Sequence, residues 1–183
     1  PVYAGTGCIT TKDTIRLSQR AADLGADVLS IITPFFASAS QNELYNHYRE
    51  VADAVDLPVV LYNIPARTGN SLDPATVGRL AKDVKNIVGA KDSSGNFDTM
   101  KQYIEKTASL DKEFSVLSGN DSLILPALVF GGKGGIAGCA NVFPHTMVAI
   151  YEQFVAGNLE EAKKTQDSIR IFRSCFRFGN PNT

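Results

Sequence analysis

The clearest indication of the fold is in residues 59–92, VVLYNIPARTGNSLDPATVGRLAKDVKNIVGAKD. This stretch opens on an apolar run at 59–62, passes through a proline-containing turn into an amphipathic segment at 74–82, and returns to an apolar run at 87–90. Asp73 before Pro74 places a capping carboxylate ahead of a proline at the first helical position, which is a typical helix start. The stretch therefore predicts a strand, a helix and a second strand.

This alternation of strand and helix repeats along the chain. Apolar runs of strand length also occupy residues 2–4, 28–32, 114–117 and 135–137. Segments with helical spacing occupy residues 11–24, 41–55, 97–107, 121–130, 143–156 and 159–172. Strands buried on both faces and separated by helices predict an α/β fold with a parallel sheet, either doubly wound or closed into a barrel.

The pattern contains six strand-helix units, whereas a closed (β/α)8 TIM barrel needs eight. The sequence opens directly on a strand and closes on GNPNT, residues 179–183. We therefore expect residues 1–183 to form one partial TIM-barrel domain that covers about strands 3 to 8. On this interpretation two N-terminal βα units and the C-terminal helices are missing.

Composition restricts the classes of function. The chain is 44% hydrophobic and 20% charged, with a net charge of -1 and no basic run, so nucleic acid is not an expected partner. Its apolar runs fall short of the roughly 20 residues that cross a bilayer, and no signal peptide is visible, so no membrane association is expected.

The cysteines and histidines argue against a metal or disulfide protein. Cys8, Cys139 and Cys175 are widely spaced without a Cys-x-x-Cys pair, which fits reduced thiols in a cytoplasmic protein. Two histidines, His47 and His145, cannot form a three-histidine metal site, and both are expected to be structural or solvated.

Lys91 is the first candidate catalytic residue. Strand alternation predicts that Ile87, Gly89 and Lys91 share one face, so that Lys91 points into the barrel. Desolvation at the end of an apolar strand disfavours the ammonium form, and carbonyl attack requires the neutral amine. Catalytic residues of such barrels lie at the C-terminal strand ends, although a lone lysine is more often a solvated surface residue.

Tyr62 and Arg67 are the next candidates. Tyr62 ends the preceding strand, and Arg67 lies in the turn that follows it. A phenol can relay a proton and a guanidinium can clamp a carboxylate. The alternative is that Tyr62 only packs its ring and Arg67 is a solvated loop residue.

Two glycine-rich segments fit cofactor motifs poorly. The GTG at residues 5–7 has Thr10 where a dinucleotide-binding motif needs its third glycine. GGKGGIAG, residues 131–138, lacks the Gly-Lys-Ser/Thr ending of a phosphate loop and precedes a strand. Its glycines are expected to let backbone approach a ligand closely.

Taken together, these segments resemble the dihydrodipicolinate synthase and N-acetylneuraminate lyase superfamily. The resemblance rests on YNIPARTG at 62–69 and GAK at 89–91, supported by ITPFF at 32–36, SGND at 118–121, GGKGGIAG and the closing GNPN. It implies a class I, pyruvate-dependent aldolase, a carbon-carbon lyase in a cytoplasmic homotetramer that needs no cofactor or metal. Lys91 would form the Schiff base, Tyr62 would relay protons, Arg67 would hold a carboxylate and Ile136 would offer backbone contacts to the keto acid.

The resemblance leaves the second substrate, an aldehyde, open. A 4-hydroxy-tetrahydrodipicolinate synthase-like enzyme is favoured by whole-chain similarity. Phe35 and Phe36 stand where such synthases carry a Tyr-Tyr pair, which favours a 2-keto-3-deoxy sugar acid aldolase or dehydratase, or an N-acetylneuraminate lyase-like enzyme. An inactive keto-acid-binding barrel and a phosphate-binding barrel enzyme are the alternatives of other classes.

Overall fold

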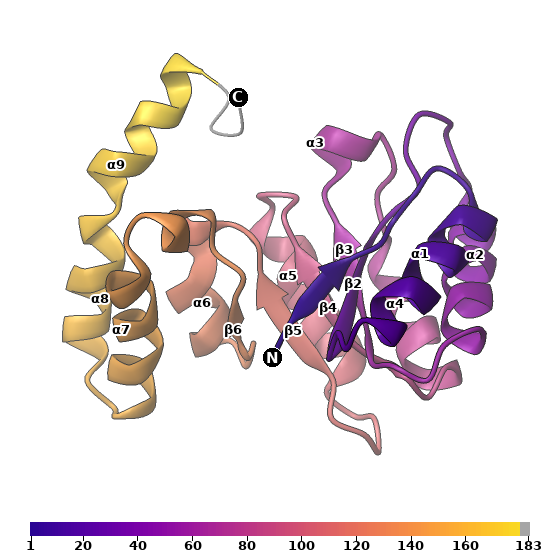
Figure 1. The fold of residues 1–183 in the computed structure, drawn as a ribbon. Coiled ribbons are helices and arrows are strands. Elements are labelled where there is room, and N and C mark those ends of the chain that lie inside the picture. The colour runs from indigo at the N-terminus through magenta and orange to yellow at the C-terminus, as the bar shows by residue number, and fades with distance from the viewer. Residues whose placement is uncertain (180–183) are drawn as a thin grey trace.

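Six short parallel strands form one sheet in the computed structural model, which describes residues 1–179 (Figure 1). The strands are paired in the order in which they occur in the sequence. They are β1 (Tyr3–Gly5), β2 (Val28–Ile32), β3 (Val59–Asn63), β4 (Ile87–Asp92), β5 (Ser115–Ser118) and β6 (Gly134–Gly135). The predicted α/β fold with a parallel sheet is confirmed, and every predicted strand is present within two residues of its expected bounds.

A helix follows each strand, as the sequence pattern predicted. The main helices are α1 (Thr11–Asp23), α2 (Gln41–Asp53), α4 (Pro74–Asp83), α5 (Phe97–Thr107), α6 (Ile124–Val129) and α7 (Pro144–Val155). The remaining elements of the described chain are α3 (Pro65–Thr68), α8 (Leu159–Ser168), α9 (Arg170–Ser174) and the 3-10 turns η1 (Asp121–Leu123), η2 (Gly138–Asn141) and η3 (Cys175–Phe178). The expected helix at 159–172 is thus two helices, and the one at 121–130 begins as a 3-10 turn.

The expected capping role of the Asp73 carboxylate is wrong. Asp73 is the N-cap of α4 and Pro74 occupies its first turn, but the Asp73 side chain makes no capping hydrogen bond. Its backbone carbonyl instead accepts the N–H groups of Thr76 and Val77, at 2.9 and 3.0 Å. Because proline has no N–H, the first turn has fewer donors to satisfy, and the backbone supplies the acceptor.

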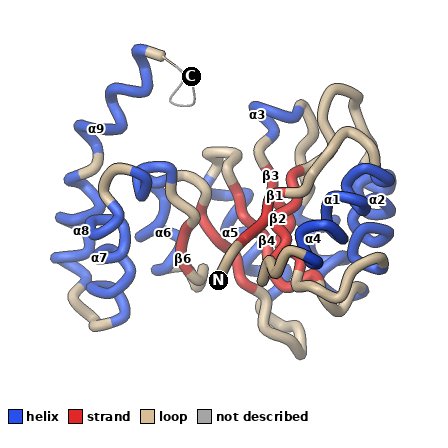
Figure 2. Tube along the Cα trace, in the orientation of Figure 1, coloured by secondary structure: helices blue, strands red, loops and turns tan. Residues whose placement is uncertain are grey.

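Two apolar clusters hold the molecule together. The larger lies between strands β1 to β5 and their covering helices, with Leu29, Leu61 and Val77 fully buried. The smaller joins α6, α7 and α8 around Ile124, Ile150 and Ala162. Figure 2 shows the same division: α1, α2 and α4 gather at one end of the sheet, and α6, α7 and α8 at the other. None of the helices in residues 1–179 is long and apolar enough to span a bilayer.

Strand β4 contains a bulge that determines which side chains face the ligand side. Val59 pairs with Ile87 but Val60 pairs with Gly89, so Val88 is an extra residue. Ile87 and Ala90 therefore both pack into the larger apolar cluster under the helices. The prediction that Ile87 shares a face with Lys91 is wrong, because the bulge interrupts strict alternation. Gly89 and Lys91 remain on the opposite face, as predicted.

The sheet is curled, so that its helix-free face is concave. Tyr3 of β1 and Ile136, which follows β6, line the same cavity although they come from opposite ends of the sheet. Among the described residues β1 and β6 each pair with one neighbour only. The fold is therefore a curled, six-stranded half-barrel with helices outside and the concave face inside.

Candidate active site

Lys91 and Tyr62 meet on the concave face of the sheet. The two residues are register partners on adjacent strands β3 and β4. Lys91 Nζ lies 3.7 Å from the centroid of the Tyr62 ring. Both residues stand near the C-terminal ends of their strands, where barrel enzymes carry their catalytic groups. The structure thus brings together the two side chains that the sequence identified as catalytic candidates.

Two cavities share Lys91, Tyr62 and Ile136. The inner cavity has a volume of about 370 Å³ and lies in the hollow of the sheet, lined also by Tyr3, Gly5, Gly7, Ser30 and Ile32. The outer cavity has a volume of about 570 Å³ and lies beyond the strand ends, lined also by Ser93, Gly119, Asn120, Asp121, Asn141 and Arg173. Lys91 is therefore half-buried at the junction of a mainly apolar hollow and a polar mouth.

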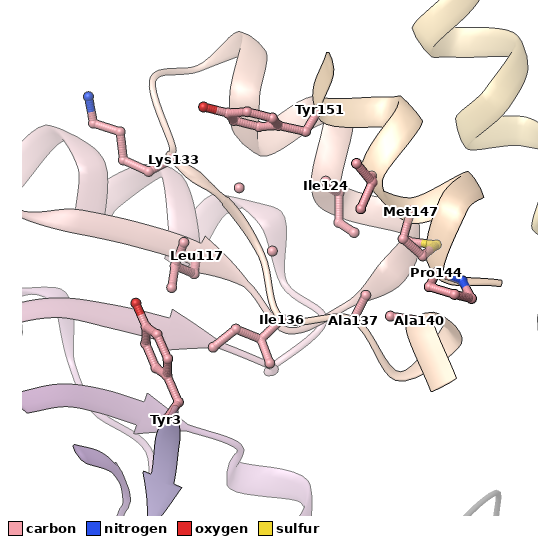
Figure 3. Close-up of a pocket in the computed structure, with 13 residues that line it drawn as sticks. Tyr3, Leu117, Ile124, Lys133, Ile136, Ala137, Ala140, Pro144, Met147 and Tyr151 are labelled. Atoms are coloured by element: carbon pink, nitrogen blue, oxygen red, sulfur yellow. The ribbon is translucent and has the colours of Figure 1, made fainter. Parts of the chain in front are cut away.

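Ile136 directly follows β6. In Figure 3 its side chain points toward Tyr3, across a third cavity of about 420 Å³ between β1 and the β6–α7 region. The Ile136 N–H donates to the Ser118 carbonyl at 2.9 Å. Since this N–H is engaged within the sheet, the backbone group that Ile136 can offer a ligand is its carbonyl oxygen.

Gly119 makes room for the Lys91 side chain. A Cβ at Gly119 would lie 2.9 Å from Lys91 Cε and would clash with the Ser93 hydroxyl. The Gly119 N–H donates to the Asp92 carbonyl at 2.8 Å, so the backbone cannot easily move away. In the 131–138 segment, close packing requires a glycine at position 135, because a Cβ there would lie 2.8 Å from Ile124 Cγ1.

A buried hydrogen-bond network ties together the strand ends that carry Tyr62 and Lys91. Asn63 Nδ2 donates to Asp92 Oδ1 at 2.8 Å, and Ser94 Oγ donates to Asp92 Oδ2 at 2.8 Å. Asn63 Oδ1 accepts the Leu72 N–H at 3.0 Å. Burial raises the pKa of the Asp92 carboxyl, while the hydrogen bonds from Asn63 and Ser94 oppose that rise. The network fixes β3 against β4 from the helix side, behind the candidate catalytic pair.

Arg67 is not among the residues that line the two cavities. It lies on α3, which rises beyond the end of β3 (Figure 1), and it is exposed. Phe36, in the loop after β2, is 93% exposed and has a left-handed backbone φ of 80°. The structure therefore places both residues on the rim, and the expected carboxylate clamp at Arg67 stays a prediction.

Sequence reasoning missed an ion pair in the outer cavity. Arg173 Nη1, on α9, lies 3.1 Å from Asp121 Oδ2. Asp121 Oδ1 accepts the Cys139 N–H at 3.0 Å. Burial and the neighbouring Asp121 raise the pKa of the Cys139 thiol to about 11, so it is no thiolate nucleophile at neutral pH. The SGND segment pointed to Asp121, but nothing local in the sequence distinguished Arg173.

The histidines lie away from the cavities. His47 is buried and its Nδ1 hydrogen-bonds to the Thr11 hydroxyl at 2.9 Å. Burial lowers the pKa of His47 to about 4. His145 is exposed, so one histidine is structural and the other solvated, as expected. Within residues 1–179 no three His, Cys, Asp or Glu side chains are grouped so that they could hold a metal ion. The closing GNPN motif, apart from Gly179, lies outside the described residues.

Comparison with known proteins agrees with this geometry. The model of the dihydrodipicolinate synthetase family matches residues 1–183. A 4-hydroxy-tetrahydrodipicolinate synthase of Methanopyrus kandleri is 39% identical over 182 residues, which cover 99% of this chain and 60% of that protein. The corresponding protein of Methanoculleus marisnigri is 43% identical, with 99% of this chain and 61% of that protein covered.

Solved structures give the same result. The crystal structure of a dihydrodipicolinate synthase from Thermotoga maritima superimposes with a TM-score of 0.94 at 32% identity. A prophage protein of the dihydrodipicolinic acid synthase family from E. coli K12, solved in complex with pyruvate, gives a TM-score of 0.94 at 33% identity. Each match covers 99% of this chain and 61% of the other. The chain therefore spans about 60% of the length of the relatives that it matches.

Proposed function

Because the chain belongs to the dihydrodipicolinate synthetase family, we propose that it forms a Schiff base with pyruvate or a related 2-keto acid and acts as a class I aldolase. The reaction that similarity favours is that of a 4-hydroxy-tetrahydrodipicolinate synthase. The observation that carries the proposal is the Lys91 amine on the Tyr62 ring, at the end of a strand and inside the concave cavity. The pyruvate bound to the E. coli relative supports the choice of keto acid.

The chemistry begins with attack of the neutral Lys91 amine on the ketone carbon. The carbonyl oxygen takes up protons and leaves as water, which gives an iminium ion on Nζ. Loss of a proton from the neighbouring carbon gives an enamine, and Tyr62 is the side chain in contact with the amine that can relay protons. The enamine carbon then adds to an aldehyde, and water releases the product and restores the amine.

Orientation of the keto acid supplies much of the rate advantage. Holding reactants in one geometry can be worth on the order of 7 to 11 kcal/mol. Ile136 lines the cavity around Lys91, and its carbonyl would limit how the keto acid can lie there. Arg67, on the rim, would clamp a carboxylate on substrates that reach beyond the strand ends.

The finer assignments follow from the same family membership. We infer that the six strands correspond to strands 3 to 8 of an eight-stranded TIM barrel and that residues 1–183 are part of that single domain. The chain's coverage of 61% of the solved relatives supports this correspondence. Cytoplasmic location and a homotetramer are proposed on the same ground.

A sugar-acid aldolase is the second candidate. Phe36 carries no hydroxyl where a tyrosine is expected from the resemblance. It is exposed on the rim and does not line the outer cavity, so the polar groups that a substrate meets there come from other residues. Such an enzyme would use the same imine with a polyhydroxylated aldehyde in place of an acidic one.

The experiment is a screen of 2-keto acids for aldol cleavage and condensation with the complete gene product. Pyruvate release or consumption is measured for 2-keto-3-deoxy sugar acids, N-acetylneuraminate and aspartate semialdehyde. Lys91→Arg is the matched control, because it keeps a cation but cannot form an imine. Activity that survives in Lys91→Arg removes the proposed mechanism, and binding of pyruvate without any turnover favours the inactive keto-acid-binding barrel.

A further inference from the structure

The outer cavity contains a guanidinium group besides the Lys91 amine. Arg173 belongs to α9, which stands beyond the strand ends in Figure 1, and its side chain is 25% exposed. It lines the same cavity as Lys91, Ser93 and Asn120. Among residues 1–179, the ionisable amine, guanidinium and carboxyl groups of that cavity are those of Lys91, Arg173 and Asp121.

The single anion is already engaged by the protein. The Asp121 side chain is only 7% exposed and accepts hydrogen bonds from the Cys139 N–H and from Arg173. Its backbone carbonyl accepts from Gln166 Nε2 at 2.8 Å, and Gln166 Oε1 accepts the Leu125 N–H at 3.0 Å. Asp121 is thus a fixed support that lies deeper than Arg173.

The Arg173 guanidinium can serve a second acceptor. It carries five N–H donors, and its hydrogen bond to Asp121 engages Nη1. Arginine binds carboxylates through two parallel hydrogen bonds, a geometry that lysine cannot reproduce. Arg173 is thus held by Asp121 and at the same time lines the cavity, where its other N–H donors can serve a ligand.

We propose that Arg173 determines specificity by binding a carboxylate on the substrate portion that does not form the imine, an acidic aldehyde or its aldol product. The inference rests on the proposed function, since it requires a keto acid held on Lys91. The outer cavity, at about 570 Å³, is within the range of small-molecule sites. Arg173 lines the cavity that contains Lys91, whereas Arg67 stands further out on the rim, so Arg173 is placed to bind the part of the substrate nearer the imine.

The test separates this role from a purely structural one, in which Arg173 only fixes α9 through its ion pair with Asp121. The complete gene product is loaded with pyruvate and reduced with borohydride, and mass spectrometry checks the adduct on Lys91. The adduct is then titrated with succinic semialdehyde and with butanal, its uncharged analogue. The unsubstituted protein should bind succinic semialdehyde at least ten times more tightly, and Arg173→Gln should remove that preference while butanal binding stays unchanged.

Two further variants make the outcome decisive. Arg173→Lys keeps a positive charge near Asp121 and should retain only part of the preference. Arg177→Gln removes an exposed charge four residues away that lines neither cavity, and it should leave the preference intact. An undiminished preference for succinic semialdehyde in Arg173→Gln overturns the proposal; if that variant unfolds, the same result in Arg173→Lys does so. The proposal is also overturned if the unsubstituted protein shows no such preference. Absence of the adduct removes the proposed function, and this inference with it.

Discussion

Alanine at position 119 is expected to impair catalysis by displacing Lys91. The new Cβ would lie 2.9 Å from Lys91 Cε and 3.1 Å from Ser93 Cβ. Ordinary carbon contacts are about 3.5 to 4.0 Å, so Cε has to retreat by roughly 0.6 to 1.1 Å. The backbone at position 119 cannot easily shift instead, because its N–H donates to the Asp92 carbonyl at 2.8 Å.

A shift of that size has a large catalytic effect. Misplacement of a reacting group by about 1 Å can cost on the order of a hundredfold in rate, so we expect kcat to fall by roughly ten- to a hundredfold. The overpacked site should also lose about 1 to 3 kcal/mol of stability. Turnover, the rate of borohydride trapping with pyruvate, and chemical denaturation measure the three effects.

Gly78→Ala is the matched control. A Cβ there meets the Lys106 Cβ at 3.4 Å, which is at the near edge of ordinary contact, and position 78 lies inside α4, away from the cavities. Alanine should leave turnover unchanged and add up to about 1 kcal/mol of stability through helix propensity. If Gly119→Ala turns over and traps pyruvate as fast as Gly78→Ala, then Gly119 does not position Lys91.

Three other changes test separate parts of the account. Phe36→Asn should raise the free energy of unfolding by about 0.5 to 1 kcal/mol, because asparagine tolerates the left-handed φ of 80° and the exposed ring makes few contacts to lose; equal denaturation midpoints would contradict this. His47 has a folded-state pKa of about 4 against about 6.5 unfolded, so the unfolded chain binds the proton first as the pH falls. Its contribution is complete above pH 6.5 and is lost toward pH 4, by up to roughly 3 kcal/mol, and His47→Gln should flatten the pH dependence of denaturation in that window. Tyr62→Phe should lower kcat by roughly 10²-fold or more with little change in the dissociation constant of pyruvate, because a proton relay acts mainly on transition states; an unchanged kcat would mean that the ring only packs.

The alternation of strands and helices could be predicted because its signals are local. Apolar residues dominate the short runs at 28–32 and 59–62, and Pro74 and the Gly157–Asn158 pair mark where helices start or stop. Lys91 and Tyr62 could be identified for the same reason, since each ends an apolar run and parallel strands bring their ends together.

Other features depend on contacts between distant residues. The bulge at Val88 arises from pairing with β3 and turns Ile87 to the helix side, which no periodicity within β4 reveals. Residues 159–172 divide into α8 and α9 at Ile169, which is buried in the smaller apolar cluster. Arg173 enters the cavity because Asp121, 52 residues earlier in the sequence, holds it there. Such long-range pairings are set by tertiary structure and leave no short sequence signature.

Schiff-base formation at Lys91 is tested by reduction with borohydride in the presence of pyruvate, followed by peptide mass spectrometry. Only an imine is reducible under these conditions, so a covalent pyruvate adduct should appear on the peptide that contains Lys91 and on no other lysine peptide. The adduct should be absent without pyruvate and absent from Lys91→Arg. An unmodified Lys91 peptide in a protein that still consumes pyruvate would contradict the account.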